Sequence, residues 1–174
     1  MSTVQKINFE PVSDILPIKR KDLPLADPSL ANALNALALV DGEWVTIDNS
    51  YKWVRAASAA AAGNAATVRS FPVFMEAGRT DRQAMADKKT TALFRGEYEF
   101  DTRIYDATAV VAGGAAITTV LQPLKVASIT IGSRVYVGLV GHGGSGDTSP
   151  VVAYVTRLPA SNGGKLRFMS GYRS

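Results

Sequence analysis

The only histidine of the chain, His142, lies in a glycine-rich segment that reads GHGGSGDTS over residues 141–149. Ser145, Asp147 and Ser149 lie close to it, so the segment holds the three residue types of a serine hydrolase. Nucleophilic catalysis needs a base oriented by a third group and an oxyanion hole, which usually come from separate elements. A flexible glycine loop lacks the rigidity of such a site. We therefore interpret His142 as a residue of a solvent-exposed turn and predict no catalytic residue.

The same glycines could in principle cradle a phosphate group. A phosphate-binding loop joins a strand to the N-terminus of a helix and usually supplies a lysine. Here Pro150 and an apolar, strand-like run follow the loop, and the next lysine is Lys165. We therefore predict no nucleotide or other cofactor.

Three acidic residues, Glu97, Glu99 and Asp101, alternate along a segment that we expect to be a strand. Successive carboxylates on one face of a strand lie roughly 7 Å apart, and paired carboxylates can bind calcium or act as acid and base. Arg95 and Arg103 bracket the three carboxylates, however. This pattern favours a charge-balanced face toward solvent or a neighbouring subunit, and we predict no metal site.

Residues 1–27 predict an extended N-terminal arm. Pro11, Pro17, Pro24 and Pro28 follow at short spacing, and each proline ends or forbids a regular helix. The arm carries more apolar side chains than a disordered tail would. Two interpretations stay open: a strand and loop folded on the chain's own barrel, or an arm that reaches onto a neighbouring subunit. For the second, the candidate contact residues are Ile7, Phe9, Ile15, Leu16, Lys19, Arg20 and Lys21.

The basic cluster of the arm, Lys19 to Lys21, does not predict a nucleic-acid interface. Three charges without interleaved aromatic residues are too few, and the net charge of +4 is mild. The cluster could contact an acidic surface of a partner or form a solvated patch.

The remaining residues, 28–174, predict one β domain. Asp27 and Pro28 suit the start of a short helical turn over 28–35, followed by a strand. An Asp-Gly pair at 41–42 predicts a hairpin, and the turn at 48–50 predicts a second one between 43–47 and 51–56. Trp44 and Trp53 flank this second turn, where they could pair across the hairpin or serve as core or interface anchors.

Further strands are indicated by apolar alternation and turn residues. Residues 67–76 predict an edge strand with Pro72 in it, and residues 94–104 alternate with period two as a single half-buried antiparallel strand. Residues 126–140 are more uniformly apolar, with a turn at 132–133, and strands at 151–157 and 165–169 complete the pattern. We place on one face of the 126–140 segment Ile129, Ile131, Val135, Val137 and Leu139. The alanine-rich residues 56–66 and the polar residues 78–91 predict connections.

These elements predict an all-β fold, a small antiparallel β-barrel or sandwich with an extended N-terminal arm. The chain has 174 residues and no cysteine, which excludes disulfides and thiolate metal sites. Its first residues show no apolar signal region, and no run approaches the length of a membrane span. We expect a protein made in the cytoplasm that does not contact a membrane.

Three stretches resemble the head decoration (cement) proteins of tailed bacteriophages. Residues 38–47 read ALVDGEWVTI, like the opening strand pair of that family, and residues 89–102 read KTTALFRGEYEFDT, like its central strand. The closing β domain is matched by GAAI at 114–117, QPLKV at 122–126, Gly-Asp at 146–147, AYV at 153–155 and KLRF at 165–168. The resemblance covers roughly residues 38–170.

The resemblance implies a β-tulip protein that sits on the outer surface of the expanded capsid, as a homotrimer in most such proteins. Its partners would be the phage major capsid protein and further copies of itself, without direct nucleic-acid contact. The family carries no catalytic residues, so the resemblance implies no enzymatic activity. A tail-tube or other virion structural subunit is the alternative, because those proteins are also small β-barrels with arms.

Overall fold

A computed structural model describes residues 10–12, 19–31, 38–56, 70–74, 89–95, 98–108, 114–161 and 163–170 of the chain. These residues form twelve strands and one short 3-10 helix, η1 (Pro28–Ala31). The expected all-β fold is therefore confirmed. Within the described ranges, no helix is long and apolar enough to cross a membrane.

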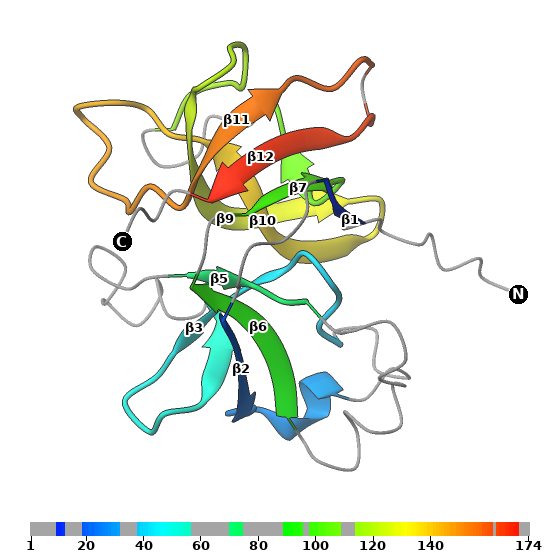
Figure 1. Ribbon diagram of the computed structural model, residues 1–174, viewed down its shortest axis with the longest axis vertical. Helices are drawn as coiled ribbons and strands as arrows, with labels where there is room; N and C mark the ends of the chain where they lie inside the picture. The colour runs from blue at the N-terminus through cyan, green and yellow to red at the C-terminus, as the bar shows by residue number, and fades with distance from the viewer. Residues whose placement is uncertain are drawn as a thin grey trace, which may run out of the picture.

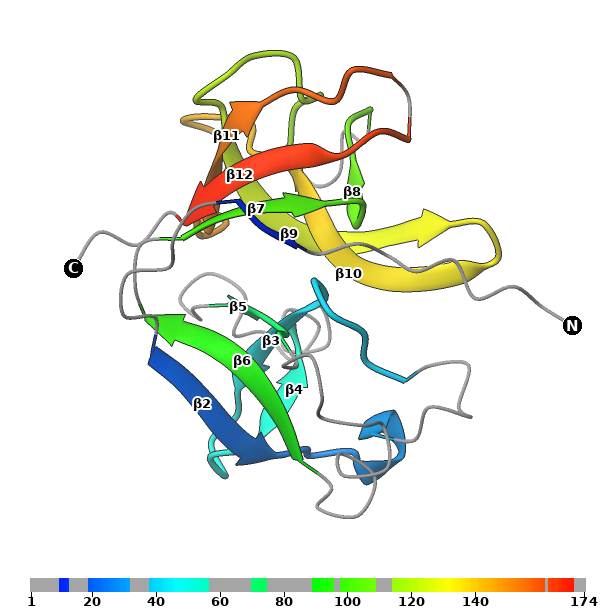
Figure 2. The ribbon, with the colours of Figure 1, turned by 45° about the vertical axis from the view of Figure 1, so that its right-hand side comes forward.

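The upper part of the molecule is a seven-stranded sheet, which we call the large sheet (Figures 1 and 2). Its strands are antiparallel except for the parallel pair β10–β8. In spatial order they are β1 (Glu10–Pro11), β7 (Glu99–Thr102), β12 (Leu166–Ser170), β11 (Ala153–Arg157), β9 (Pro123–Ile131), β10 (Arg134–Gly141) and β8 (Tyr105–Asp106).

The lower part consists of two smaller sheets (Figure 2). One pairs β2 (Lys19–Pro24) with β6 (Lys89–Arg95), and the other has the order β4 (Trp53–Arg55), β3 (Trp44–Ile47) and β5 (Phe71–Pro72). The described strands thus form three open sheets packed as a sandwich, without the closed barrel that the sequence also allowed.

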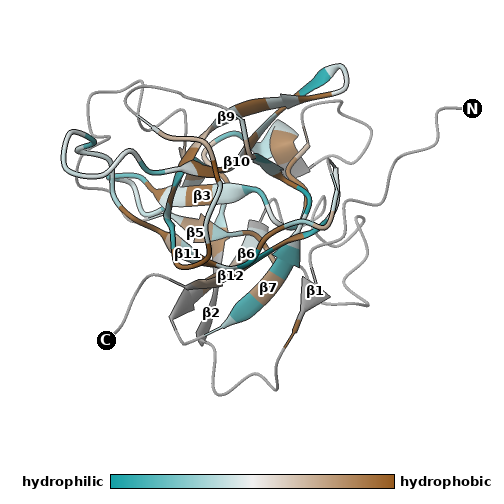
Figure 3. Cartoon of the chain, turned by 90° about the horizontal axis from the view of Figure 1, so that it is seen from above, coloured by the Kyte–Doolittle hydropathy of each residue, from teal (hydrophilic) through white to brown (hydrophobic). Residues whose placement is uncertain are grey.

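The single strand predicted over 94–104 is divided between the two parts of the molecule, and that prediction is wrong. Its first residues belong to β6 of the lower part, whereas β7 lies in the large sheet. β7 carries hydrophilic and hydrophobic residues (Figure 3), but burial does not alternate along it: Glu99 is half-buried, whereas Phe100, Asp101 and Thr102 are all buried. Period two reports the facing of side chains but carries no information about which sheet each half joins.

Part of the predicted arm belongs to the fold of the chain itself. β2 runs antiparallel to β6, from Lys19 opposite Arg95 to Pro24 opposite Lys89. Leu23 and Leu25 are buried in the lower core. For residues 19–27 the structure therefore matches the first interpretation, a strand folded on its own domain.

The turns at 27–31 and 41–43 combine correct and incorrect predictions. The Asp27 carboxylate accepts a hydrogen bond from the Ser29 N–H at 2.9 Å and begins η1 as expected.

Gly42 adopts the left-handed conformation of a turn (φ 85°), but residues 38–40 form no strand before it, so the first predicted hairpin is absent. The second hairpin is confirmed as β3–β4, with Asp48 accepting from the N–H groups of Ser50 and Lys52.

Both faces of β3 are buried, which separates the two tryptophans. Trp44 enters the upper core and packs against Phe168 with ring centroids 6.0 Å apart. Trp53 lies in the lower core against Phe71 at 5.9 Å, and its indole N–H donates to the Thr90 carbonyl. The two rings do not pair across the hairpin, because Trp53 lies opposite Ile47.

The β9–β10 hairpin also has two buried faces. Its Gly132–Ser133 turn is confirmed, but Ile129 lies opposite Tyr136 and Val137 lies opposite Ser128. Because of this pairing, odd-numbered residues of β9 share a face with even-numbered residues of β10. The five apolar residues predicted for one face therefore lie on two, with Ile129 and Ile131 on one face and Val135, Val137 and Leu139 on the other. Ile129 packs in a core with Ile104, whereas Val137 and Leu139 join the upper core. The base of this hairpin therefore forms the layer between the upper and lower parts.

Candidate functional site

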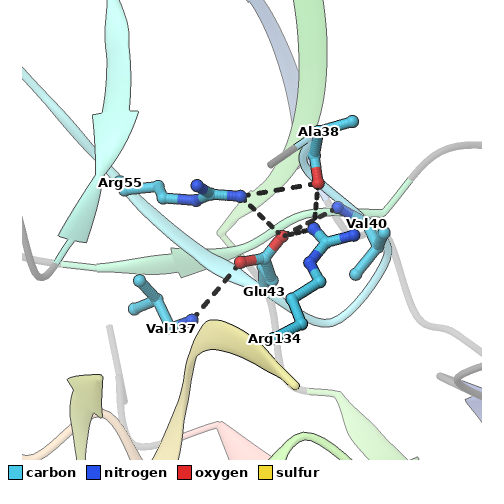
Figure 4. Close-up of polar contacts among 6 residues, drawn as sticks. All are labelled: Ala38, Val40, Glu43, Arg55, Arg134 and Val137. Carbon is cyan, nitrogen blue, oxygen red and sulfur yellow. Dashed lines mark hydrogen bonds and ion pairs between the residues drawn. The ribbon is translucent and has the colours of Figure 1, made fainter. Parts of the chain in front are cut away.

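A buried carboxylate, Glu43, joins the lower part of the molecule to the β9–β10 hairpin (Figure 4). Its Oε2 lies 3.3 Å from Nη2 of Arg55 on β4 and 3.4 Å from Nη2 of Arg134 at the start of β10. The Val40 N–H donates to Oε2 at 3.0 Å, and the Val137 N–H donates to Oε1 at 3.3 Å. We call Glu43, Arg55 and Arg134 the Glu43 cluster.

The Glu43 cluster joins residues 38–43 and Arg55 of β4 to the start of β10, which is far from both in the sequence. Both arginines also donate to the carbonyl of Ala38, and the Arg134 guanidinium lies 4.6 Å from the centre of the Tyr136 ring. Burial raises the pKa of Glu43, and Arg55, the two N–H donors and Arg134 lower it only in part. The carboxylate oxygens are enclosed and occupied, so this arrangement suits a structural link rather than proton transfer to a substrate.

A second buried ion pair anchors the glycine-rich loop. Nζ of Lys125 on β9 lies 2.7 Å from Oδ2 of Asp147, and both side chains are almost fully buried. Oδ2 also accepts from the Gly143 N–H, and Oδ1 accepts from the Ser149 N–H. Burial alone would raise the pKa of Asp147, but hydrogen bonds from Lys125, Gly143 and Ser149 outweigh it and hold that pKa well below its ordinary value.

The imidazole of His142 forms hydrogen bonds within the same loop, and this side chain is mostly buried. The prediction of a solvent-exposed turn residue is therefore wrong for the imidazole. Nδ1 accepts a hydrogen bond from the Gly144 N–H at 3.1 Å, so Nε2 carries the proton and donates to the Ser149 carbonyl at 3.0 Å. Ser145 is exposed at the surface. Both ring nitrogens are engaged by the backbone, which leaves none to activate a serine hydroxyl.

Acid should weaken the fold through Asp147. Its pKa is lower in the folded chain than in the unfolded chain, so this carboxylate stabilises the fold above its unfolded pKa and loses that contribution as the pH falls. We expect the free energy of unfolding to fall from about pH 5 downward. Urea titrations at several pH values should show a shallower acid slope for Asp147→Asn; equal slopes in the two proteins would contradict this assignment.

The predicted acidic face is partly confirmed, with different partners. Arg167 contacts Asp101 through two bonds of 2.8 and 3.1 Å from the neighbouring strand β12, and Arg157 approaches it at 3.4 Å. The hydrogen bond from Arg167 lowers the pKa of Asp101. Arg103 is exposed, and Glu97 lies outside the described residues. The charge of Asp101 is balanced as expected, by Arg167 of β12 and Arg157 of β11, but Asp101 is buried rather than exposed to solvent.

The predicted contact residues of the arm are only partly placed. Lys19, Arg20 and Lys21 lie in β2, with their backbone paired to β6. The other four, Ile7, Phe9, Ile15 and Leu16, lie outside the described residues. In the described ranges, no group of three or more histidine and acidic side chains could hold a metal ion.

An exposed apolar turn, which we call the Val120–Leu121 tip, lies at the upper end of the molecule, between residues 114–119 and β9 (Figure 1). Val120 and Leu121 are 53% and 67% exposed. Leu121 adopts a left-handed backbone (φ 64°), a conformation that costs an ordinary side chain about 1–2 kcal/mol. Its N–H donates to the Val155 carbonyl at 2.7 Å, which ties the tip to the large sheet.

The side chain of Gln122 fixes the shape of this tip. Its Oε1 accepts from the N–H groups of Thr118 and Thr119, and its Nε2 donates to the Ala116 carbonyl at 2.8 Å. Two apolar side chains are thus held toward solvent on a rigid, strained turn. Strain of this kind persists only where the surrounding structure enforces it, and it often marks a binding element. The sequence held a signal for it, an apolar Val-Leu pair directly before Gln-Pro.

The comparisons with known proteins returned no match to this chain, whether among family models, curated proteins or solved structures.

Proposed function

We propose that this protein is a structural virion protein, a decoration protein that binds the outside of the expanded bacteriophage head and reinforces contacts between major capsid protein subunits. The sequence resemblance over residues 38–170 and the all-β sandwich support this role. The observation that carries it furthest is the Val120–Leu121 tip, because a rigid, exposed apolar element suits a protein contact.

The tip can supply a modest attachment energy per copy. Full burial of one valine or leucine side chain contributes about 1.5–3 kcal/mol relative to exposure. A single copy would therefore bind weakly through this element. Many copies at symmetry-related positions of a shell would bind well, because linked contacts reinforce one another. The Glu43 cluster and the buried Lys125–Asp147 pair then keep each copy rigid when force acts on the shell.

Substitution of Leu121 by asparagine separates attachment from folding. Asparagine tolerates the left-handed backbone, so we expect the free energy of unfolding to stay within about 0.5 kcal/mol or to rise. Attachment to expanded, undecorated heads should fall at least tenfold, because each symmetry-related contact loses its largest exposed side chain. Cosedimentation with such heads measures the attachment.

Tyr51→Asn is the matched control. Tyr51 is also exposed and left-handed (φ 61°), but it lies in the β3–β4 turn at the opposite end of the molecule (Figure 1). We expect Tyr51→Asn to bind heads like the unaltered protein. If both variants bind heads as well as the unaltered protein does, the tip is not a contact element. If both lose binding to the same extent, the loss is not specific to the tip.

A further inference from the structure

Strand β9 is longer than its partner on one side. β10 pairs with it from Leu124 to Ile131, whereas β11 pairs with it only at Pro123 and Leu124. Beyond Leu124 the hairpin therefore extends past β11 as a ribbon, which β8 joins on the β10 side only at Leu139 and Val140. One edge of this ribbon, residues 126–130 of β9, has no neighbouring strand among the described residues. We call it the β9 edge.

The alternation of hydrogen bonds shows which backbone groups the β9 edge presents. On β10, Leu139 donates outward to the Ile104 carbonyl, and Val137 donates outward to Glu43. The residues opposite them, Val126 and Ser128, must direct their own N–H and C=O groups away from β10. Thr130 follows with the same parity. Three consecutive donor and acceptor pairs thus face away from the hairpin.

The β9 edge lacks the features that normally prevent strand addition. Natural edges carry charges, prolines or bulges, or are very short. Residues 126–131 read VASITI, without charge, proline or glycine, and the pairing with β10 has no bulge. Ser128 and Thr130 are exposed. The one lysine nearby, Lys125, is buried against Asp147 and does not protect the edge.

We propose that the β9 edge binds the same edge of a second copy of this chain. The two strands run antiparallel about a two-fold axis at Ser128, so that Val126 of one copy lies opposite Thr130 of the other. Three hydrogen-bonded pairs form, and the two large sheets become continuous. The segment suits its own copy because it is uncharged: a chain of net charge +4 meets no like-charge repulsion there. This inference is independent of attachment to capsids, and it predicts a dimer in solution where the sequence resemblance implies a homotrimer.

Ser128→Lys tests the pairing, with Ser145→Lys as its matched control. Both serines are exposed and both changes add one positive charge, but only Ser128 lies on the edge. Sedimentation equilibrium should give twice the chain mass for the unaltered protein and for Ser145→Lys, and a monomer for Ser128→Lys. A monomeric unaltered protein, or a dimer that Ser128→Lys leaves intact, would overturn the proposal.

Amide hydrogen exchange on the same proteins identifies the contact. In the dimer the amides of Val126, Ser128 and Thr130 should be protected, and Ser128→Lys should abolish that protection at Val126 and Thr130. The amides of Ala127 and Ile129 bond to β10, so they stay protected in both proteins and show that the hairpin is folded. An oligomer whose Val126, Ser128 and Thr130 amides exchange freely uses another surface and would also overturn the proposal.

Discussion

Glu43→Gln should lower the free energy of unfolding by about 3–5 kcal/mol at neutral pH. The substitution preserves the shape of the side chain but leaves the guanidinium groups of Arg55 and Arg134 in a buried site without their carboxylate. Loss of one partner from a buried ion cluster is costly because the remaining charges stay desolvated. Urea unfolding followed by tryptophan fluorescence measures the change.

Two further variants make this prediction specific. Glu99→Gln alters a half-buried carboxylate that accepts a hydrogen bond from the Thr156 hydroxyl, and it should cost only about 0.5–1.5 kcal/mol. In an Arg134→Met background, Glu43→Gln should cost less than it does alone, because one buried charge has already been removed. Additive costs for Glu43→Gln and Arg134→Met would contradict a coupled cluster.

Lys125→Met should be the second most damaging change, with an expected loss of about 3 kcal/mol or more. It leaves the Asp147 carboxylate buried with backbone donors but without its ammonium partner. The glycine-rich loop should loosen with it, so the amides of Gly143 and Ser149 should exchange faster. Lys52→Met, at an exposed position, is the control and should change stability by less than about 0.5 kcal/mol. Similar losses for the two lysines would contradict the buried pair.

Local features of the fold could be predicted from the sequence, because turns and alternation are local signals. The β3–β4 hairpin, the Gly132–Ser133 turn and the start of η1 follow from turn residues and a helix cap. The assignment of strands to sheets could not be predicted in the same way. β6 and β7 are nearly continuous in the chain, yet they pair with β2 and β12 in different sheets.

The charged clusters were beyond sequence reasoning for a related reason. Glu43 and Arg134 are 91 positions apart, and Lys125 and Asp147 come from a strand and a loop that only the fold brings together. Read alone, Lys125 looks like an ordinary surface lysine in an apolar run. The glycine-rich loop drew attention to His142, whereas its buried anchor is Asp147, the acidic residue five positions later.

The most direct test of the proposed function is whether the purified protein binds phage heads. Expanded, undecorated heads assembled from the major capsid protein of the same genome should bind it to saturation, with a fixed number of copies per head and increased resistance of the shell to heat. Unexpanded heads should bind little of it. A protein that ignores expanded heads, or that instead assembles into stacked rings like a tail tube, would contradict the account.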